Sequence, residues 1–436
     1  MPEQVQPSHQ RAIERLLLII AGCFLGVNFI TLALVRGAVE LNHWLHFASW
    51  VLCAGLGHLW LERHLPRRDP LLFALAMFLS GWGLLLIDRL AQPFADRQTL
   101  WLYIATLVLL LIATFQQPIR WLRNYRYTLL ILGLTLLTAT IILGRNPSGQ
   151  VGAPALWLGF DSLYFQPSEL LKIILVAFLA SYMAEQHPIL RSEQLREHPR
   201  SPMLSSRIVG PILLMWGISI VILVWQRDLG TASIFFIVFL LLLYVASGSR
   251  IILLGGFGLI ILAGFAAYNL FDVVALRVDI WLNPWPEADG RAYQIVQSLL
   301  AFSAGGIWGE GIGQGLPTYI PVVHSDFVFA AAAEEWGLVG VLTIIACIAT
   351  LVMRGLRIAI RQSSYSFRSL LAVGLSMLIA VQSLMIMAGV LKIIPLTGVT
   401  LPFMSYGGSS LVVTFVIIGL LLRLSMVEEN GHAAKP

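Results

Sequence analysis

Charged residues are scarce in this sequence. Asp, Glu, Lys and Arg make up only 12% of its 436 residues, whereas 58% are hydrophobic, and the mean hydropathy is +0.82. Soluble globular domains carry about twice this share of charged residues. The composition therefore argues against a soluble enzyme or binding module and predicts that lipid is the solvent for most of the chain.

The sequence also lacks a basic patch and paired cysteines. The net charge is +5 and the isoelectric point about 9.2, yet the basic residues are scattered through short segments between apolar runs. This distribution argues against a nucleic-acid partner. Cys23, Cys53 and Cys347 lie in apolar runs without CxxC or Cys/His spacing, so neither disulfides nor a zinc site is expected.

Long apolar runs are abundant instead. A membrane-spanning helix needs about 20 apolar residues, and we predict twelve spans: 13–35, 44–62, 70–87, 98–115, 126–143, 168–184, 207–225, 228–247, 250–270, 326–353, 367–391 and 406–424. The first run is long and lacks a small-residue cleavage site, so we interpret it as a retained span and not a signal peptide. The expected fold is an all-α, polytopic integral membrane protein with about twelve transmembrane helices.

The distribution of arginine and lysine predicts the orientation, because cytoplasmic segments are enriched in both residues. With the N-terminus inside, the inner segments hold 19 of the 28 basic residues and the outer segments hold 8, while Lys172 lies within a span. Both termini are therefore predicted to be cytoplasmic.

This topology leaves one long extracytoplasmic loop, residues 271–325. Within it, residues 294–306 are apolar enough to form an amphipathic or re-entrant helix at the interface. Six glycines follow between Gly305 and Gly315, but their spacing fits no nucleotide-binding loop. We expect a tight turn at the membrane surface.

Several polar residues fall at the outer face. Glu169 and Lys172 have i, i+3 spacing at the start of the sixth span, which allows a salt bridge, and they form either a structural pair or part of a site. Asp228 is expected to cap the helix that follows it. Glu334 and Glu335 lie about two turns into the tenth span and need partners inside the bundle.

Asp326 begins the tenth span, where a low-dielectric surrounding raises the pKa of a carboxyl group. It is either a helix cap or the best candidate for a general base. His324 is a second candidate proton carrier, although a loop histidine bound to the backbone is commoner. With Lys392 and residues 405–410 at the last outer turn, these groups suit a substrate with an anionic head and an apolar tail.

Five blocks of sequence resemble those of a known family in order and spacing. They are FQPSELLK, RDLGT, the run from NPWPEADG to GEGIGQG, YIPVVHSDFVFAAAAEEWG and PLTGVTLPFMSYGGSS. These blocks resemble the signatures of the SEDS family (shape, elongation, division and sporulation), the RodA/FtsW-type proteins. That family has ten spans, so residues 1–65 are expected to be an N-terminal addition of two helices to a core at 66–426, followed by a cytoplasmic tail at 427–436.

The resemblance implies a peptidoglycan glycosyltransferase that polymerises lipid II at the outer face of the bacterial cytoplasmic (inner) membrane, for cell shape or division. It implies a class B penicillin-binding protein as transpeptidase partner. Asp326 is the expected catalytic residue, as the base or as ligand of a divalent cation such as Mg²⁺ or Mn²⁺. The expected substrate-binding residues are Trp157, Glu169, Lys172, Arg277, Arg291, His324, Lys392 and Ser405.

Four positions depart from the family pattern. Val322 replaces a usual acidic residue, and Arg227 replaces a usual proline. Leu156 stands where arginine is usual, and Met385 where asparagine is common in the eleventh span. These changes spare Asp326 but remove neighbours that would orient it, so they bear on activity more than on fold.

Two other functions stay open. Twelve spans and an outward polar cavity also fit a flippase for a lipid-linked precursor, although we find no inverted repeat of broken helices and no symmetrical pair of midplane charges. The altered residues near Asp326 also allow a scaffold without catalytic activity that positions a partner enzyme.

Overall fold

The computed structural model describes residues 7–37, 40–146, 155–160, 163–194, 206–226, 228–362 and 366–426. Within these ranges the chain is almost entirely helical, with one short hairpin of strands. The predicted all-α membrane fold is confirmed.

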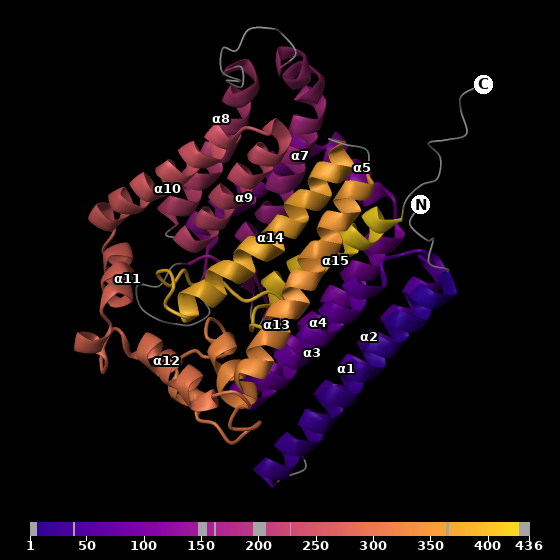
Figure 1. Ribbon diagram of the computed structural model, residues 1–436, viewed down its shortest axis with the longest axis vertical. Helices are drawn as coiled ribbons and strands as arrows, with labels where there is room; N and C mark the ends of the chain where they lie inside the picture. Colours follow the sequence, from indigo (N-terminus) through magenta and orange to yellow (C-terminus); the bar gives the residue numbers. More distant parts are fainter. Residues whose placement is uncertain are drawn as a thin grey trace.

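Twelve helices coincide with the twelve predicted spans (Figure 1). They are α1 (Pro7–Arg36), α2 (Leu41–His64), α3 (Pro70–Leu90), α4 (Gln92–Thr114), α6 (Arg126–Leu143), α7 (Pro167–Gln194), α8 (Ser206–Trp225), α9 (Leu229–Ser247), α10 (Arg250–Leu270), α13 (Val328–Arg361), α14 (Phe367–Val390) and α15 (Gly408–Ser425). Ten of them are long and apolar enough to cross a membrane. The other two are α2, in which three buried histidines interrupt the apolar sequence, and α8, whose apolar part among the described residues is Trp216–Trp225.

Shorter elements connect these spans. They are α5 (Gln117–Asn124), α11 (Asp272–Leu282) and α12 (Tyr293–Gly305), the single 3₁₀ turns Trp285–Glu287 and Pro317–Tyr319, and strands β1 (Leu158–Phe160) and β2 (Leu163–Phe165). The strands pair antiparallel with Leu158 opposite Phe165. α12 confirms the helix predicted at 294–306, inside the long outer loop.

In Figure 1 the C-terminal helices α13, α14 and α15 lie between two flanking groups of helices. α13 packs on α14, and α15 packs on α4. α3, α7 and α14 are buried over most of their length, so they form the interior. α1 and α2 lie along one flank, whereas α8, α9 and α10 lie along the other.

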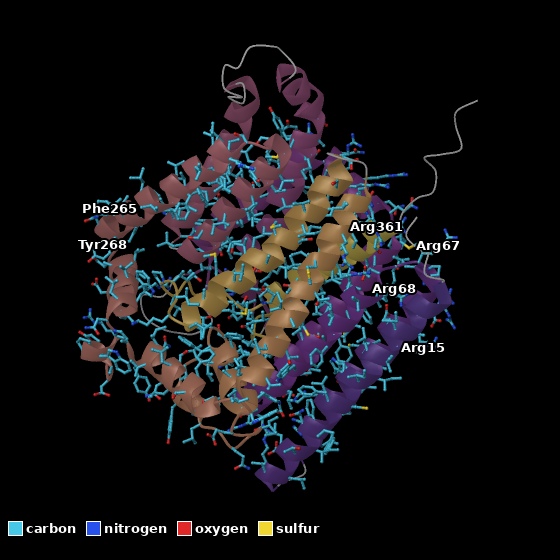
Figure 2. All side chains as sticks on the ribbon, in the orientation of Figure 1. Arg15, Arg67, Arg68, Phe265, Tyr268 and Arg361 are labelled. Atoms are coloured by element: carbon cyan, nitrogen blue, oxygen red, sulfur yellow. The ribbon has the colours of Figure 1, made fainter. Side chains whose placement is uncertain are left out.

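The basic residues mark one end of this bundle. Figure 2 shows Arg15, Arg67, Arg68 and Arg361 on the same side, near both chain termini, whereas α11 and α12 lie toward the opposite side. This separation agrees with the predicted topology, in which the arginine-rich segments are cytoplasmic and the long loop is extracytoplasmic.

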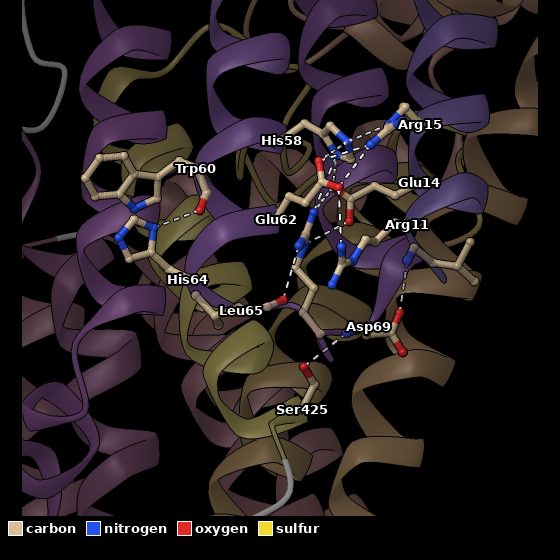
Figure 3. Close-up of polar contacts among 12 residues, drawn as sticks. Arg11, Glu14, Arg15, His58, Trp60, Glu62, His64, Leu65, Asp69 and Ser425 are labelled. Atoms are coloured by element: carbon tan, nitrogen blue, oxygen red, sulfur yellow. Dashed lines mark hydrogen bonds and ion pairs between the residues drawn. The ribbon is translucent and has the colours of Figure 1, made fainter. Parts of the chain in front are cut away.

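Ion pairs join the first two helices to the rest of the bundle. At the inner end, Glu14 Oε1 lies 2.5 Å from Arg68 Nη2 and 2.7 Å from His58 Nδ1 (Figure 3). At the outer end, Arg36 Nη1 lies 3.2 Å from Asp88 Oδ2. The predicted boundary at residue 65 stays a prediction, and these contacts show that α1 and α2 share buried charges with the segment that follows.

Candidate active site

The outer face holds a cavity of about 210 Å³ beside the start of α13. Four of the predicted site residues line it: Arg277, Arg291, Asp326 and Lys392. Most of the remaining wall is apolar and includes Leu276, Ile280, Trp281, Ile295, Ile394 and Leu396. The structure therefore brings one carboxyl group and three cationic groups together against apolar surface. We call this space the outer cavity.

The long loop and the turn after α14 place these cations. Arg277 and Trp281 lie one turn apart on α11, which puts them on one face of the helix. Trp281 Nε1 donates to the main-chain oxygen of Lys392 at 3.1 Å, so α11 is held against the turn after α14. Arg291 pairs with Glu287 at 2.8 Å on the exposed part of the loop.

Asp326 has the surroundings expected of a proton acceptor. It is not the cap of α13, because Phe327 occupies that position and makes no side-chain cap hydrogen bond. Burial raises the pKa of Asp326 above its ordinary value of 3.8. The hydrogen bond that Ser325 Oγ donates to Asp326 Oδ1 at 2.7 Å and the charge of Arg277 lower this pKa in part. A raised pKa makes the carboxylate a stronger base.

Gly398 lies between Arg277 and Asp326. Its φ of +70° belongs to the left-handed region that favours glycine. A Cβ at this position would lie 3.3 Å from Arg277 Nη2 and 3.8 Å from Asp326 Oδ2. Arg277 Nη1 also donates to the main-chain oxygen of Thr397 at 3.3 Å. The segment after α14 therefore holds the guanidinium beside the carboxylate.

Glu169 and Lys172 form the salt bridge that their spacing allows. Their charged atoms are 2.8 Å apart, and both side chains are buried. Lys172 Nζ also donates to Gln382 Oε1 at 2.7 Å, and Gln382 Nε2 donates to the main-chain oxygen of Thr400 at 2.9 Å. The pair does not line the outer cavity. It supports the segment that contains Gly398.

Asp228 caps α9, as predicted, because its Oδ1 accepts a hydrogen bond from Thr231 N at 3.2 Å. Its other oxygen accepts a hydrogen bond from Ser168 Oγ at 3.2 Å. Burial raises the pKa of Asp228. The preceding residue, Arg227, lies outside the described residues.

Three further predicted substrate-binding residues, besides Glu169 and Lys172, do not line the outer cavity. The His324 ring stacks on Phe94, with centroids 4.7 Å apart, and its main-chain oxygen accepts a hydrogen bond from Tyr406 N. Ser405 Oγ accepts a hydrogen bond from Leu401 N at 2.9 Å. Trp157 pairs with Arg145 through main-chain hydrogen bonds. These contacts are structural ones, and a role in substrate binding stays a prediction.

The glycine run packs into a break in α13. Gly337, in the middle of that helix, has a non-helical φ of +62°. The glycine run is attached next to this break, where Gly311 N donates a hydrogen bond to the main-chain oxygen of Glu335 at 3.0 Å. A Cβ at Gly337 would lie 2.4 Å from Gly309 N, so side chains are excluded from the contact. Four glycines of the run, from Gly306 to Gly313, also have positive φ, so the run forms the expected tight turns and in addition allows a close approach of two backbones.

Glu334 and Glu335 both find the interior partners that we predicted. Glu334 Oε1 accepts a hydrogen bond from Leu316 N at 2.6 Å. Glu335 Oε1 lies 3.2 Å from Arg89 Nε and accepts a hydrogen bond from Gly313 N. Both residues therefore hold the glycine run to α13.

The described departures from the family pattern lie away from the outer cavity. Val322 is exposed on the loop, and Met385 is buried in α14. Neither these two residues nor Leu156 lines the cavity wall. The immediate neighbours of Asp326 are Ser325, Arg277 and Gly398. Val322 is linked to them through its main-chain oxygen, which accepts a hydrogen bond from Ser325 N at 3.0 Å. The effect of the four substitutions on activity stays a prediction.

The side chains of the outer cavity could bind a divalent cation only if the substrate supplied further oxygen ligands. Among the described residues, no three His, Cys, Asp or Glu side chains are grouped to hold a metal ion, and Asp326 is the carboxylate on the cavity wall. Mg²⁺ is often held by one or two carboxylates together with substrate phosphates. The outer cavity fits that arrangement.

Fold and cavity together define a polytopic membrane protein with a carboxylate and a cationic surface at its outer face. The profile of the FtsW/RodA/SpoVE family, described as cell cycle protein, matches residues 71–430. The chain belongs to this family. It is accordingly a multi-pass protein of the bacterial inner membrane.

Individual relatives cover most of the chain. The peptidoglycan glycosyltransferase RodA of Mycobacterium tuberculosis (strain H37Rv) is 36% identical over 393 residues, which span 88% of this chain and 83% of that protein. The protein of the same name from Mycobacterium leprae is 34% identical over 435 residues, 96% of this chain and 92% of that one. A chain from a peptidoglycan synthase complex has 26% identity and a TM-score of 0.67, covering 82% of this chain and 97% of that one.

Proposed function

We infer that this protein is a peptidoglycan glycosyltransferase, which polymerises lipid II into glycan strands at the outer face of the membrane. The observation that carries this function is the outer cavity, where Asp326 lies beside Arg277 within the family-matching part of the chain. The names of the relatives support the same reaction.

Asp326 acts as the base in this proposal. Its carboxylate takes the proton from the acceptor sugar hydroxyl as that oxygen forms a bond to the anomeric carbon of the donor. The bond from that carbon to the pyrophosphate oxygen breaks at the same time, and its electron pair leaves with the lipid pyrophosphate. Attack from the face opposite the leaving group inverts the configuration at the anomeric carbon.

The cations act on the leaving group. Arg277, Arg291 and Lys392 surround the space beside Asp326, where guanidinium and ammonium groups can bind a pyrophosphate as its negative charge grows. The apolar walls formed by α11 and the turn after α14 suit the first part of a prenyl chain. Electrostatic stabilisation in a site that excludes water is a large contribution to catalysis.

A divalent cation, Mg²⁺ or Mn²⁺, is proposed as the cofactor. When bound, it would neutralise charge on the departing pyrophosphate. Asp326 is the protein ligand that the outer cavity offers, with substrate oxygens completing the set. The proton acceptor and the metal ligand would then share one carboxyl group.

A class B penicillin-binding protein is the proposed transpeptidase partner. The structural relative is a chain of a complex described as coordinating polymerization and crosslinking, and glycan strands need crosslinking after they are polymerised. Cell elongation and cell division are both compatible with this pairing.

The test is polymerisation by the purified full-length protein. It is supplied with lipid II and Mg²⁺ or Mn²⁺, alone and with a candidate partner, and glycan chains are separated on a gel. We expect polymer from the wild type and from Asp289→Asn, a control in an exposed residue of the same loop. Asp326→Asn should lose most of it, in the range of 10²–10⁴-fold for a general base.

The alternative functions give different results. A scaffold makes no polymer under any condition but still binds the partner. A flippase moves labelled lipid II between leaflets of a proteoliposome without lengthening it. Polymer formation that is unaffected by Asp326→Asn would disprove the assignment of the base while leaving the enzyme class intact.

A further inference from the structure

A second cavity lies at the opposite end of the bundle from the outer cavity. It measures about 270 Å³ and lies between α5, the start of α14 and the end of α15. Its residues belong to segments that the arginine distribution assigns to the cytoplasmic side. We call this space the inner cavity, and nothing in the glycosyl transfer described above uses it.

The inner cavity is strongly cationic. Four arginines line it: Arg120, Arg123, Arg368 and Arg423. Its lining contains no carboxylate among the residues that the structure describes. Ser366, the N-cap of α14, also lines it, so the positive end of that helix dipole adds to the charge. Arg368 and Arg423 already have interaction partners, so the charge available to an anion with several acceptor oxygens comes from Arg120, Arg123 and the start of α14.

Two of the arginines are available to a ligand. Arg120 and Arg123 lie one turn apart on α5 and are exposed. Within the described ranges, neither has an acidic partner at ion-pairing distance. Guanidinium groups so placed can bind phosphate oxygens in a bidentate manner.

The aromatic residues around the inner cavity indicate that it lies at the level of the lipid headgroups. Trp121 and Tyr125 are each 56% exposed at the α5 segment, and such aromatic residues are enriched at the membrane–water interface. The floor is apolar and includes the buried side chains of Ile119, Phe367 and Leu424. A ligand that fits must therefore combine a phosphate group with an apolar chain.

We propose that the inner cavity binds the phosphate group of an anionic phospholipid of the inner leaflet. Arg120 and Arg123 hold the phosphate oxygens, and the apolar floor contacts the start of an acyl chain. Basic pockets between transmembrane helices on the cytoplasmic side are suited to such headgroups. The site lies on the other side of the membrane from Asp326, so the proposal does not depend on the glycosyltransferase assignment.

The test counts lipids bound to the full-length protein in a neutral detergent. Native mass spectrometry follows a titration with phosphatidylglycerol, and phosphatidylcholine serves as the zwitterionic comparison. We expect tight binding of phosphatidylglycerol to the wild type. Arg120→Ala/Arg123→Ala should weaken it about 30-fold, since each arginine near an anionic lipid contributes roughly fivefold. Arg120→Lys/Arg123→Lys should recover only part of the binding, because lysine restores the positive charge but not the bidentate contacts.

The matched control is Arg357→Ala/Arg361→Ala, which removes two exposed arginines at the same end of the bundle outside the inner cavity. It should bind as the wild type does. Equal losses in both double variants, or a loss in neither, would overturn the site. Competition with inorganic phosphate separates the two sources of the anion: full displacement of the lipid by millimolar phosphate would show a small-anion site and overturn the lipid assignment.

Discussion

The Arg277 guanidinium and the Asp326 carboxylate lie against the same glycine, Gly398. A Cβ added there would be 3.3 Å from the guanidinium and 3.8 Å from the carboxylate. The two groups come from α11 and from the loop before α13, which are 49 positions apart in the sequence. The segment after α14 therefore sets the distance between the proposed base and a proposed pyrophosphate ligand.

Gly398→Ala is expected to reduce polymerisation, but by less than the roughly 100-fold that a 1 Å misplacement of a catalytic group costs, because the added Cβ would lie 3.3 Å from Arg277 Nη2 and displaces that flexible group only slightly. Gly248→Ala is the matched control, since Gly248 has nearly the same φ, +68°, and its Cβ would meet nothing within 4 Å. Both variants carry the same left-handed strain of about 1 kcal/mol. Equal activity of the two, measured as polymer formed per minute, would show that the Gly398 contact does not matter.

Ser325→Ala is expected to shift the pH dependence of polymerisation. The Ser325 hydrogen bond lowers the pKa of Asp326, so its removal raises that pKa further. The base must be deprotonated, and activity is lost as the pH falls through this pKa. The acidic limb of the pH–rate profile should therefore move to higher pH. Ser303→Ala, an exposed serine on α12, should leave the profile in place, and an unmoved limb in Ser325→Ala would contradict the base assignment.

Lys172→Met is expected to destabilise the protein by about 3–5 kcal/mol, because it leaves the buried Glu169 carboxylate without its cation. The double variant Glu169→Gln/Lys172→Met removes both charges and should lose less stability than Lys172→Met alone. Unfolding in detergent, followed by circular dichroism, measures both. Strictly additive effects would show that the pair is not coupled.

The outer cavity could be predicted in part from the sequence. The topology places Arg277, Arg291, Asp326 and Lys392 at one face of the membrane, and all four line the cavity. Gln382 was missed, because an amide in the middle of an apolar span carries no sign of what it contacts. It contacts Lys172, 210 positions away, and only the packing of α14 on α7 brings the two together.

Five of the predicted residues do not line the outer cavity, and for two of them, His324 and Ser405, the reason is the same. His324 and Ser405 lie close in sequence to Asp326 and to the last outer turn, but neighbouring residues can point in different directions. The His324 ring packs on Phe94 of α4, a contact between distant segments. Proximity in the sequence therefore predicts that these residues lie at the outer face of the membrane, but it does not predict whether their side chains point into the outer cavity.

Gly337→Ala is expected to release the glycine run from α13. A Cβ at residue 337 would clash with Gly309 N. In addition, the φ of +62° at the break in the helix is energetically unfavourable for alanine. Hydrogen exchange at the amides of Glu310 and Gly311, which donate to main-chain oxygens of α13, should accelerate. Gly258→Ala on α10, where a Cβ meets nothing within 4 Å, is the control. Unchanged protection in Gly337→Ala would show that the run is held by other contacts.

Arg68→Met tests whether the first two helices are an independent addition. It leaves the Glu14 carboxylate, only 1% exposed, without the cation at 2.5 Å, so a loss of several kcal/mol is expected, as for other buried pairs. Arg63→Met removes an exposed charge five residues earlier, at the end of α2, and should cost under about 0.5 kcal/mol. If α1 and α2 were a loosely attached unit, Arg68→Met would separate them from a core that unfolds at the wild-type temperature. A single cooperative transition at a lower temperature would instead show that the buried charge at Glu14 stabilises the whole bundle.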